Sequence, residues 1–127
     1  MLRALKRLLR PSGRLAYTTI LVAPGLSPAQ RRNARRSGPR AVASRSDQRR
    51  LLASAGYVDI DTVDLTAEFA ATARAWIDGW AANEAELTTL ESAERFAERQ
   101  RDRRSQLRAV EDGLLHRAMF SASTASR

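Results

Sequence analysis

The chain has 127 residues, which is enough for one small domain with a narrow margin for burying a core. Apolar residues make up 43% of the sequence and aromatic residues only 6%, so a core must consist mainly of aliphatic side chains. The absence of cysteine excludes disulfides and thiolate-bound zinc, and it agrees with a cytoplasmic location. No apolar run is long enough to span a membrane, and basic residues interrupt the N-terminal leucines, so we expect a helix of the fold there and not a signal peptide.

Positive charge is concentrated in the first 50 residues. The formal net charge is +8, of which residues 1–50 contribute +12 and residues 51–127 contribute −4. Such a field can attract nucleic acid or anionic lipid, so a small basic binding module for nucleic acid or anionic surfaces is the alternative function. The densest basic cluster has no interleaved aromatic residues and no recognised nucleic-acid-binding motif, so we expect a solvated surface segment and no nucleic-acid partner. Its members are Arg31, Arg32, Arg35, Arg36 and Arg40.

The first third of the chain predicts a helix, a strand and a second helix. Leucines at helical spacing predict a helix over residues 1–10, which Pro11 ends. The segment RLAYTTILV at residues 14–22 is short, rich in β-branched residues and flanked by turn residues, so it predicts a buried strand. Ser27 and the proline after it predict a short basic helix over about residues 28–36.

The middle of the chain predicts another helix and strand. Ser46 and Asp47 are candidate caps for a helix that runs to residue 55, and Gly56 is placed to end it. Residues 57–63 alternate between two faces and predict a second strand, with Tyr57 facing opposite to its even-numbered neighbours.

A long helical region and a last strand complete the chain. Residues 67–110 have a helical composition and predict two helices that break near residues 88–92. Thr89 or Ser92 is expected to cap the second of these helices, and Gly113 to end it. The segment LLHRAMFSAS that follows predicts a strand over residues 114–123, with a frayed tail from Thr124 onward.

Three short motifs stand in a fixed order along the chain: LLRPSGRL at residues 8–15, LLASAGY at 51–57 and GLLHRAMF at 113–120. The first is similar to the leader helix, LxPGGR turn and strand of class I S-adenosylmethionine-dependent methyltransferases, with Ser12 in place of a glycine. The second resembles the LLxxAGF motif of that family, and the third resembles its closing strand. The resemblance covers nearly all of this chain and about the second half of the family domain.

The resemblance implies an α/β fold class, with a partial Rossmann-like methyltransferase sheet and flanking helices. The chain is expected to supply the last three strands of that sheet, the final one antiparallel between the other two. Residues 1–127 then form a single domain, the C-terminal portion of the fold without its cofactor-binding N-terminal half. The intact family binds S-adenosylmethionine with a glycine-rich turn, whereas the six glycines here are scattered singly. We therefore expect no cofactor-binding residues and no bound S-adenosylmethionine in this chain alone.

The resemblance also implies partners. The strand at residues 14–22 lacks the neighbour that it has in the complete fold, and an unpaired apolar edge favours pairing or aggregation. We expect either the missing N-terminal half or a second copy in a homodimer to cover this edge. The intact enzyme is expected to act on a small-molecule substrate, and this portion is expected to be inactive alone.

Five residues are candidate substrate contacts. Thr18, Thr19 and Ile20 approach the carboxyl end of their strand, which faces substrate in the family, although strand packing explains them as simply. Trp76 and Trp80 are four residues apart and share a helix face, so they are candidates for an aromatic wall over the substrate, for core packing or for an interface.

Other candidate residues have simpler explanations. His116 is the only histidine and lies in a predicted strand with no nucleophile beside it, so no catalytic residue and no metal site is identified. Asp64 and Thr66 follow the second strand, where a helix cap is the simpler role for either of them than contact with substrate.

Overall fold

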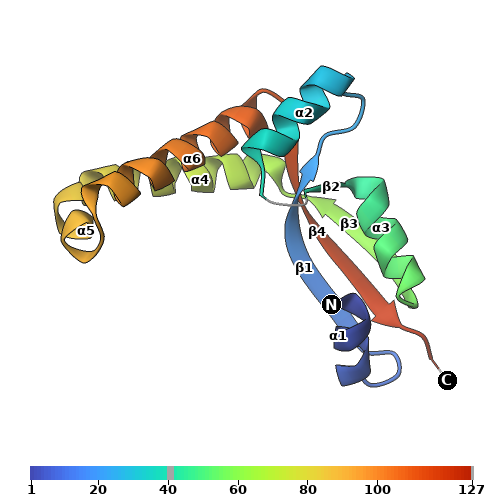
Figure 1. The fold of residues 1–127 in the computed structure, drawn as a ribbon. Coiled ribbons are helices and arrows are strands. Elements are labelled where there is room, and N and C mark those ends of the chain that lie inside the picture. Colours follow the sequence, from blue (N-terminus) through green and yellow to red (C-terminus); the bar gives the residue numbers. More distant parts are fainter. Residues whose placement is uncertain (40–41, 127) are drawn as a thin grey trace.

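A sheet and a projecting helical arm make up the molecule (Figure 1). The structure, a computed structural model, describes the backbone of residues 1–39 and 42–126. The strands are β1 (Arg14–Val22), β2 (Ala43–Ser44), β3 (Tyr57–Asp64) and β4 (Leu115–Thr124). The helices beside the sheet are α1 (Leu2–Leu8), α2 (Pro28–Ser37) and α3 (Arg45–Ser54), and the arm consists of α4 (Thr66–Ala82), α5 (Glu84–Leu90) and α6 (Ala93–Glu111).

The sheet has the order β2-β1-β4-β3. β4 lies antiparallel between β1 and β3, which confirms the predicted place and direction of the final strand. It pairs with β1 along the full length of β1, from Arg14 opposite Ser123 to Val22 opposite Leu115. On its other side β1 pairs only with the two-residue strand β2, in parallel, at its last two positions. Within the described part of the chain, the outer edge of β1 over residues 14–20 therefore has no strand partner.

Two hydrophobic clusters cover the two faces of the sheet. Because successive residues of a strand point to opposite faces, Leu21 and Val22 belong to different clusters. The cluster on the side of α1 and α3 consists of Leu21, Leu52, Ala55, Tyr57, Ala118, Phe120 and Ala122. The cluster on the side of α2 and the arm consists of Val22, Ala34, Phe69, Ala109, Val110 and Leu115. Both faces are thus covered near the carboxyl end of β1.

One sheet face is uncovered toward the amino end of β1. Thr18 is exposed there, and the register places it opposite Met119, which in turn lies opposite Val63. Residues directly opposite one another share a face, and Val63 is 42% exposed. This end of the sheet therefore presents apolar surface to solvent on one face.

A β-bulge interrupts β3. The pairing with β4 shifts between Val58 and Asp61, and Asp59 has a φ of 53°, in the left-handed region. The predicted strict alternation over residues 57–63 is therefore wrong. The extra residue turns Ile60 to the same face as Tyr57, where both contact one cluster.

Helix α3 begins earlier than predicted. Its N-cap is Ser44, not Ser46 or Asp47, and Asp47 stands three residues further on as the second partner of a capping box. The Ser44 Oγ accepts the Asp47 backbone N–H at 3.2 Å. Asp47 therefore belongs to the capping box as predicted for a helix start, but it occupies position N3 and not the N-cap. Gly56, with a φ of 91°, follows the end of the helix as expected.

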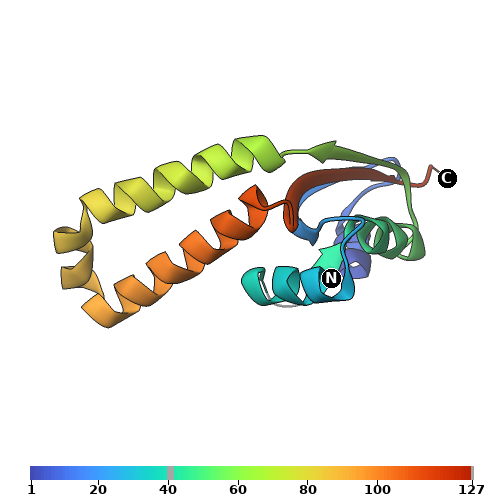
Figure 2. The ribbon, with the colours of Figure 1, turned by 90° about the horizontal axis from the view of Figure 1, so that it is seen from above.

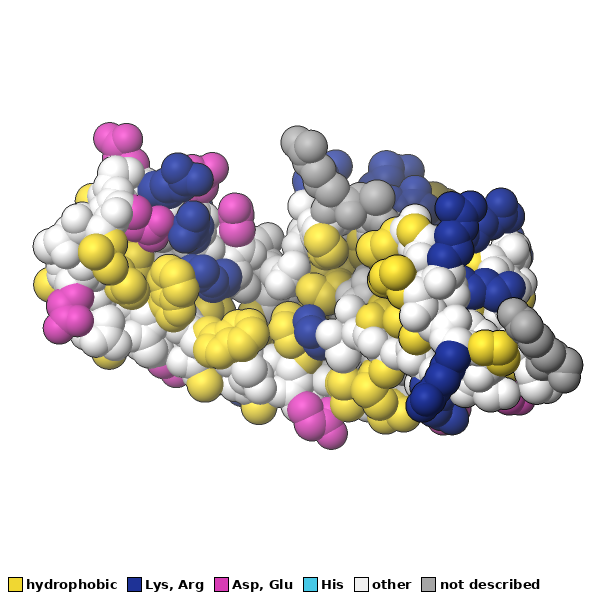
Figure 3. All heavy atoms as spheres, turned by 90° about the horizontal axis from the view of Figure 1, so that it is seen from below, with side chains coloured by type: hydrophobic (Ala, Val, Ile, Leu, Met, Phe, Trp, Pro, Cys, Tyr) yellow, Lys and Arg dark blue, Asp and Glu magenta, His cyan; other side chains and the backbone are white. Residues whose placement is uncertain are grey.

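The arm contains three helices where the sequence predicted two. Asn83 separates α4 from α5 with a non-helical ψ of 21°, and its side-chain amide donates to the Gly79 carbonyl at 2.7 Å. Ser92 caps α6 as predicted, since its Oγ accepts the Arg95 N–H at 3.1 Å. Figure 3 shows both acidic and basic side chains on the arm, whereas most of the charged side chains visible at the sheet end are Lys and Arg, in line with the charge division along the sequence.

The end of β4 is held by the turn before β1. Thr124, predicted to begin a frayed tail, is buried, and its hydroxyl donates to the Arg10 carbonyl at 2.7 Å. The same oxygen accepts the Gly13 N–H at 2.9 Å. Ser12 within this turn has a φ of 59°, a region that glycine adopts most readily. The predicted frayed tail is therefore wrong at Thr124. Its hydrogen bonds come from a turn that is distant along the chain, so the local sequence does not indicate them.

Candidate functional site

A groove lies beyond the carboxyl end of β1. In open α/β sheets, ligands bind outside the carboxyl ends of strands, near the point where the strand order reverses. The groove, here called the rim groove, has a volume of about 670 Å³. It is lined by Val22, Ala23, Pro24, Gly25, Leu26, Arg31, Arg35, Ser44 and Asp47. The turn after β1, helix α2 and the start of α3 thus meet at one place.

Helix α2 brings two arginines to the rim groove. Its start is fixed by a capping box, in which the Ser27 N–H donates to the Gln30 Oε1 at 2.9 Å and the Ser27 Oγ accepts the Gln30 N–H at 3.2 Å. Ala34 is fully buried and packs this helix onto the sheet. Arg31 and Arg35 are four residues apart, share a helix face and both line the groove. Among the described residues neither arginine forms an ion pair.

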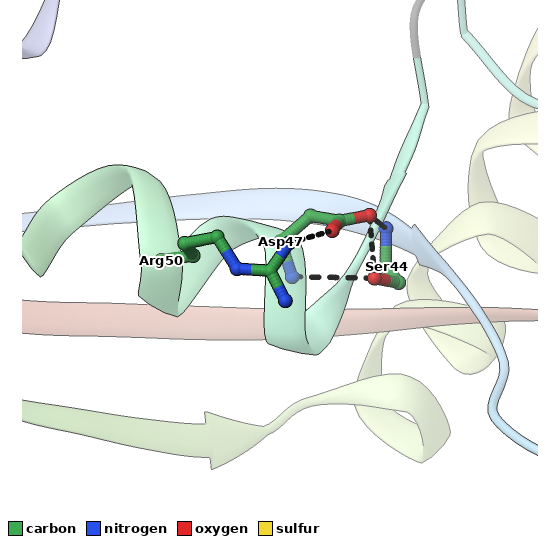
Figure 4. Close-up of polar contacts among 3 residues, drawn as sticks. All are labelled: Ser44, Asp47 and Arg50. Carbon is green, nitrogen blue, oxygen red and sulfur yellow. Dashed lines mark hydrogen bonds and ion pairs between the residues drawn. The ribbon is translucent and has the colours of Figure 1, made fainter. Parts of the chain in front are cut away.

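Asp47 is the acidic residue of the rim groove, and the cap of α3 holds its carboxylate (Figure 4). One oxygen accepts the Ser44 hydroxyl at 2.7 Å and the Ser44 N–H at 3.4 Å, and the other lies 3.8 Å from the Arg50 guanidinium. The hydrogen bonds from Ser44, and then the charges of Arg50 and Arg35, lower the pKa of Asp47 below its ordinary 3.8. The carboxylate is therefore ionised at neutral pH and already engaged within its own helix.

His116 lies at the same rim, which sequence reasoning missed. A small cleft of about 60 Å³ beside the rim groove is lined by Leu21, Val22, Pro24, Asp64, His116 and Ala118. Because β4 is antiparallel, its first residues lie at the carboxyl ends of β1 and β3, and this reversal brings the imidazole to one cleft with Asp64. The predicted antiparallel direction of β4 could have indicated this place. Imidazole and carboxylate are groups that can accept and hold a proton.

Asp64 also supports the start of α4. One of its oxygens accepts the Thr66 N–H at 3.0 Å, although the N-cap position itself is Leu65. The prediction that Asp64 or Thr66 is the helix cap is therefore wrong, although Asp64 accepts the N–H of the first helical residue.

A second groove follows the unpaired edge of β1. This edge groove has a volume of about 660 Å³ and is lined by residues of α1, β1 and α3, among them Tyr17, Thr18 and Thr19. Because adjacent strand residues point to opposite faces, a groove that contacts both threonines reaches around the edge of the strand. The Tyr17 hydroxyl donates to the Gln48 Oε1 at 2.8 Å, and burial raises its pKa above the ordinary 10.0.

The five predicted substrate contacts do not share one groove. Thr18 and Thr19 line the edge groove, whereas Ile20 packs against the cluster beneath the arm. The Thr18 Oγ1 accepts a hydrogen bond from the Arg117 guanidinium at 2.8 Å. Neither tryptophan lines the edge groove, and α4 leads away from the sheet toward α5 (Figure 2). A role in substrate binding stays a prediction for each of the five.

The tryptophans differ in their surroundings. Trp80 stacks on Phe96 with ring centroids 6.4 Å apart, and the Arg103 guanidinium lies 3.8 Å from the centre of its ring. Trp76 is 55% exposed. Trp80 therefore joins α4 to α6, which is the packing role that the sequence left open, while Trp76 presents an aromatic surface on the arm.

Two other kinds of site are absent from the described residues. No group of three or more His, Asp or Glu side chains is placed to hold a metal ion. None of the described helices combines the length and the apolar character that crossing a membrane requires.

Comparison with known proteins identifies the fold. No protein-family model and no curated protein matches the chain. Among solved structures, a protein assigned as a sarcosine dimethylglycine methyltransferase from Galdieria sulphuraria matches 99% of this chain and 47% of its own, with a TM-score of 0.84 and 16% identity. A mycolic acid cyclopropane synthase in its apo form matches 97% of this chain and 52% of its own, with a TM-score of 0.80 and 18% identity. Phosphoethanolamine N-methyltransferase 2 of Haemonchus contortus, in complex with phosphomonomethylethanolamine and S-adenosylhomocysteine, matches 98% of this chain and 29% of its own, with a TM-score of 0.78 and 16% identity.

The described fold is therefore that of the C-terminal part of class I S-adenosylmethionine-dependent methyltransferases. The chain spans between 29% and 52% of the length of these three structures. At such low identity the likeness is one of fold, and fold alone does not determine a reaction.

Proposed function

We propose that this chain is the substrate-side, C-terminal part of a cytoplasmic methyltransferase that uses S-adenosylmethionine and acts on a small molecule. The observation that carries the proposal is the sheet itself. β4 is paired on both sides, while within the described residues β1 has no strand partner on its outer edge over residues 14–20, where we expect the sheet of the complete fold to continue.

Two features of that edge support a second polypeptide segment there. Residues 14–20 of β1 have unpaired backbone groups on one side within the described part of the chain. The edge groove beside them includes the apolar side chains of Leu2, Leu5 and Leu15. Exposed strand edges and apolar surface favour association, so we expect the cofactor-binding part of the fold to pair with β1.

The residues of this chain do not fit S-adenosylmethionine by themselves. The turn after β1 holds one glycine, Gly25, and the rim groove beside it is lined by Arg31 and Arg35. Both are cations, and they disfavour a sulfonium ion placed among them. The cofactor site is accordingly assigned to the other part of the fold, and this portion is expected to be inactive alone.

The contribution of this chain is then to hold and orient the acceptor molecule. The rim groove lies where ligands of this sheet type bind, and correct positioning alone can supply a large part of an enzymatic rate enhancement. His116 and Asp64, in the adjoining cleft, are the groups placed to accept a proton from a bound acceptor.

A thermal melt with two additives tests the proposal. Purified chain is heated alone, with excess S-adenosylmethionine, and with a single-stranded oligonucleotide. A ligand that binds only the native state must raise the midpoint, so we expect a cooperative transition that neither additive moves. An increase with S-adenosylmethionine would contradict the assignment of the cofactor site to another segment. An increase with the oligonucleotide that falls steeply with salt would favour the basic binding module instead.

A further inference from the structure

The two arginines of the rim groove form a ready recognition pair for an oxyanion. Arg31 and Arg35 lie one helical turn apart on the same face of α2 and line the same hollow. A guanidinium group presents planar, parallel N–H donors that match the two oxygens of a carboxylate or phosphate. Since neither arginine forms an ion pair among the described residues, these donors are available to a ligand.

The acidic residue of the rim groove offsets only part of this charge. The Asp47 carboxylate accepts two hydrogen bonds from Ser44 and lies 3.8 Å from the Arg50 guanidinium (Figure 4). These partners belong to the first turns of α3 and hold the carboxylate at the helix start, where the helix dipole also favours it. Arg35 is close enough to help lower the pKa of Asp47, so the lining of two arginines and one aspartate keeps a formal charge of +1.

The floor of the groove leaves room for a ligand. The turn after β1 passes through Gly25, which has a φ of 75° and, apart from its two chain neighbours, no heavy atom within 4 Å of the position that a Cβ would take. Val22 and Leu26 add apolar lining beside the arginines. A hollow of about 670 Å³ with apolar walls and a few charged groups is typical of small-molecule sites.

The lining favours a small anion over a nucleic acid strand. Sites for single strands combine a basic track with aromatic side chains on which bases stack, and the rim groove has no aromatic lining residue among those described. Arg32 and Arg36 of the same helix do not line it. The arginines that face the groove are therefore a selected pair and not the whole basic cluster.

We propose that the rim groove binds the oxyanion group of a small molecule, a carboxylate or a phosphate, through Arg31 and Arg35. The identification of that molecule as the methyl acceptor rests on the proposed function. The anion site itself is a property of this chain, and it is measured without any cofactor.

The test is an NMR titration of the ¹⁵N-labelled chain with inorganic phosphate and, separately, with acetate. We expect saturable shifts confined to the amides of the groove lining, with a dissociation constant in the range of about 1 to 10 mM for so small a probe. The variant R31Q/R35Q should bind at least about tenfold more weakly. The matched control R32Q/R36Q removes the same charge from the same helix and should bind as the original chain does. The stronger of the two probes identifies whether the ligand carries a phosphate or a carboxylate.

Three results would overturn the proposal. The first is the absence of saturable shifts with both probes, and the second is equal weakening in R31Q/R35Q and R32Q/R36Q, which would mean that only net charge attracts the anion. The third is oligonucleotide binding that requires all four arginines and falls steeply with salt. If anion binding fails while the melt with S-adenosylmethionine behaves as expected, only the substrate class is wrong. If the melt contradicts the proposed function while anion binding persists, the anion site in the rim groove is confirmed, but its role in binding the methyl acceptor is wrong.

Discussion

Replacing Thr124 by valine tests how firmly the end of β4 is held. The Thr124 hydroxyl donates to the Arg10 carbonyl at 2.7 Å and accepts the Gly13 N–H at 2.9 Å. Valine has nearly the same shape but carries a methyl group in place of the hydroxyl, so both hydrogen bonds are lost with little change in packing. The residue is only 6% exposed, which limits replacement of these bonds by water.

The expected loss of stability depends on which hydrogen bonds remain in the valine variant. The Gly13 N–H also donates to the Arg10 carbonyl at 2.9 Å, so neither backbone group is left wholly unpaired. The full penalty for burying an unsatisfied group therefore does not apply. Two net hydrogen bonds of about 0.5–1.5 kcal/mol each give an expected loss of about 1–3 kcal/mol in the free energy of unfolding. That is a large part of the stability of a small domain.

Urea unfolding followed by circular dichroism measures this loss, with hydrogen exchange of the Gly13 amide as a local readout. The control is Thr124→Ser, which keeps the hydroxyl and loses one methyl group worth about 0.8 kcal/mol. We expect the serine variant to be the more stable of the two and to protect the Gly13 amide better. The reasoning is refuted if the valine variant unfolds at the same urea concentration as the original chain, or if serine is the more damaging change.

Two further predictions concern helix ends and pH. Gly56→Ala should destabilise the chain by about 1–2 kcal/mol, because φ is 91° there, whereas Gly79→Ala, at an open position near the end of α4, should stabilise it by about 0.5–1 kcal/mol; urea midpoints that move in the same direction would contradict this. The lowered pKa of Asp47 means that its contribution to stability is complete above pH 3.8 and is lost as the pH falls through the lower folded-state value. Asp47→Asn should therefore reduce the thermal midpoint at neutral pH and have no such effect in strong acid, and a difference that is constant across this range would count against the cap.

Local sequence signals were sufficient to predict the helices and strands whose ends are marked by turn or cap residues. β1 occupies residues 14–22 as predicted, because a proline and a glycine precede it and another proline and glycine follow it. α2 begins at Pro28 as predicted, since a serine cap and a proline at the first helical position are specific signals. In each case the information lies within a few residues of the boundary.

Structural features that depend on pairing between distant strands could not be predicted from local sequence signals. β2 has only two residues and is a strand because of its pairing with the end of β1. The bulge at Asp59 is a property of the register with β4, and no glycine marks it. The order of the three long strands was available only through the resemblance to a known family.

The sequence indicated some residues of the candidate site, but it did not indicate how they come together in space. Arg31 and Arg35 stood out as members of a basic cluster, but their selection from it depends on how α2 packs over the end of β1. His116 looked isolated because its neighbour Asp64 is 52 residues away along the chain. The tryptophans share a helix face as predicted, yet the length and direction of the arm decide what that face can contact.

The central position of β4 also constrains how the sheet forms. Both long neighbours of β4 precede it along the chain, and β1 and β3 make no ladder with one another. A ribosome that has synthesised everything up to the end of the arm has therefore produced two strands that cannot yet pair. Contacts between Arg14 and Ser123 close a loop of more than one hundred residues, and such distant pairings slow folding. We therefore expect the sheet to assemble late, and until it does, the apolar side chains of β1 stay exposed to aggregation.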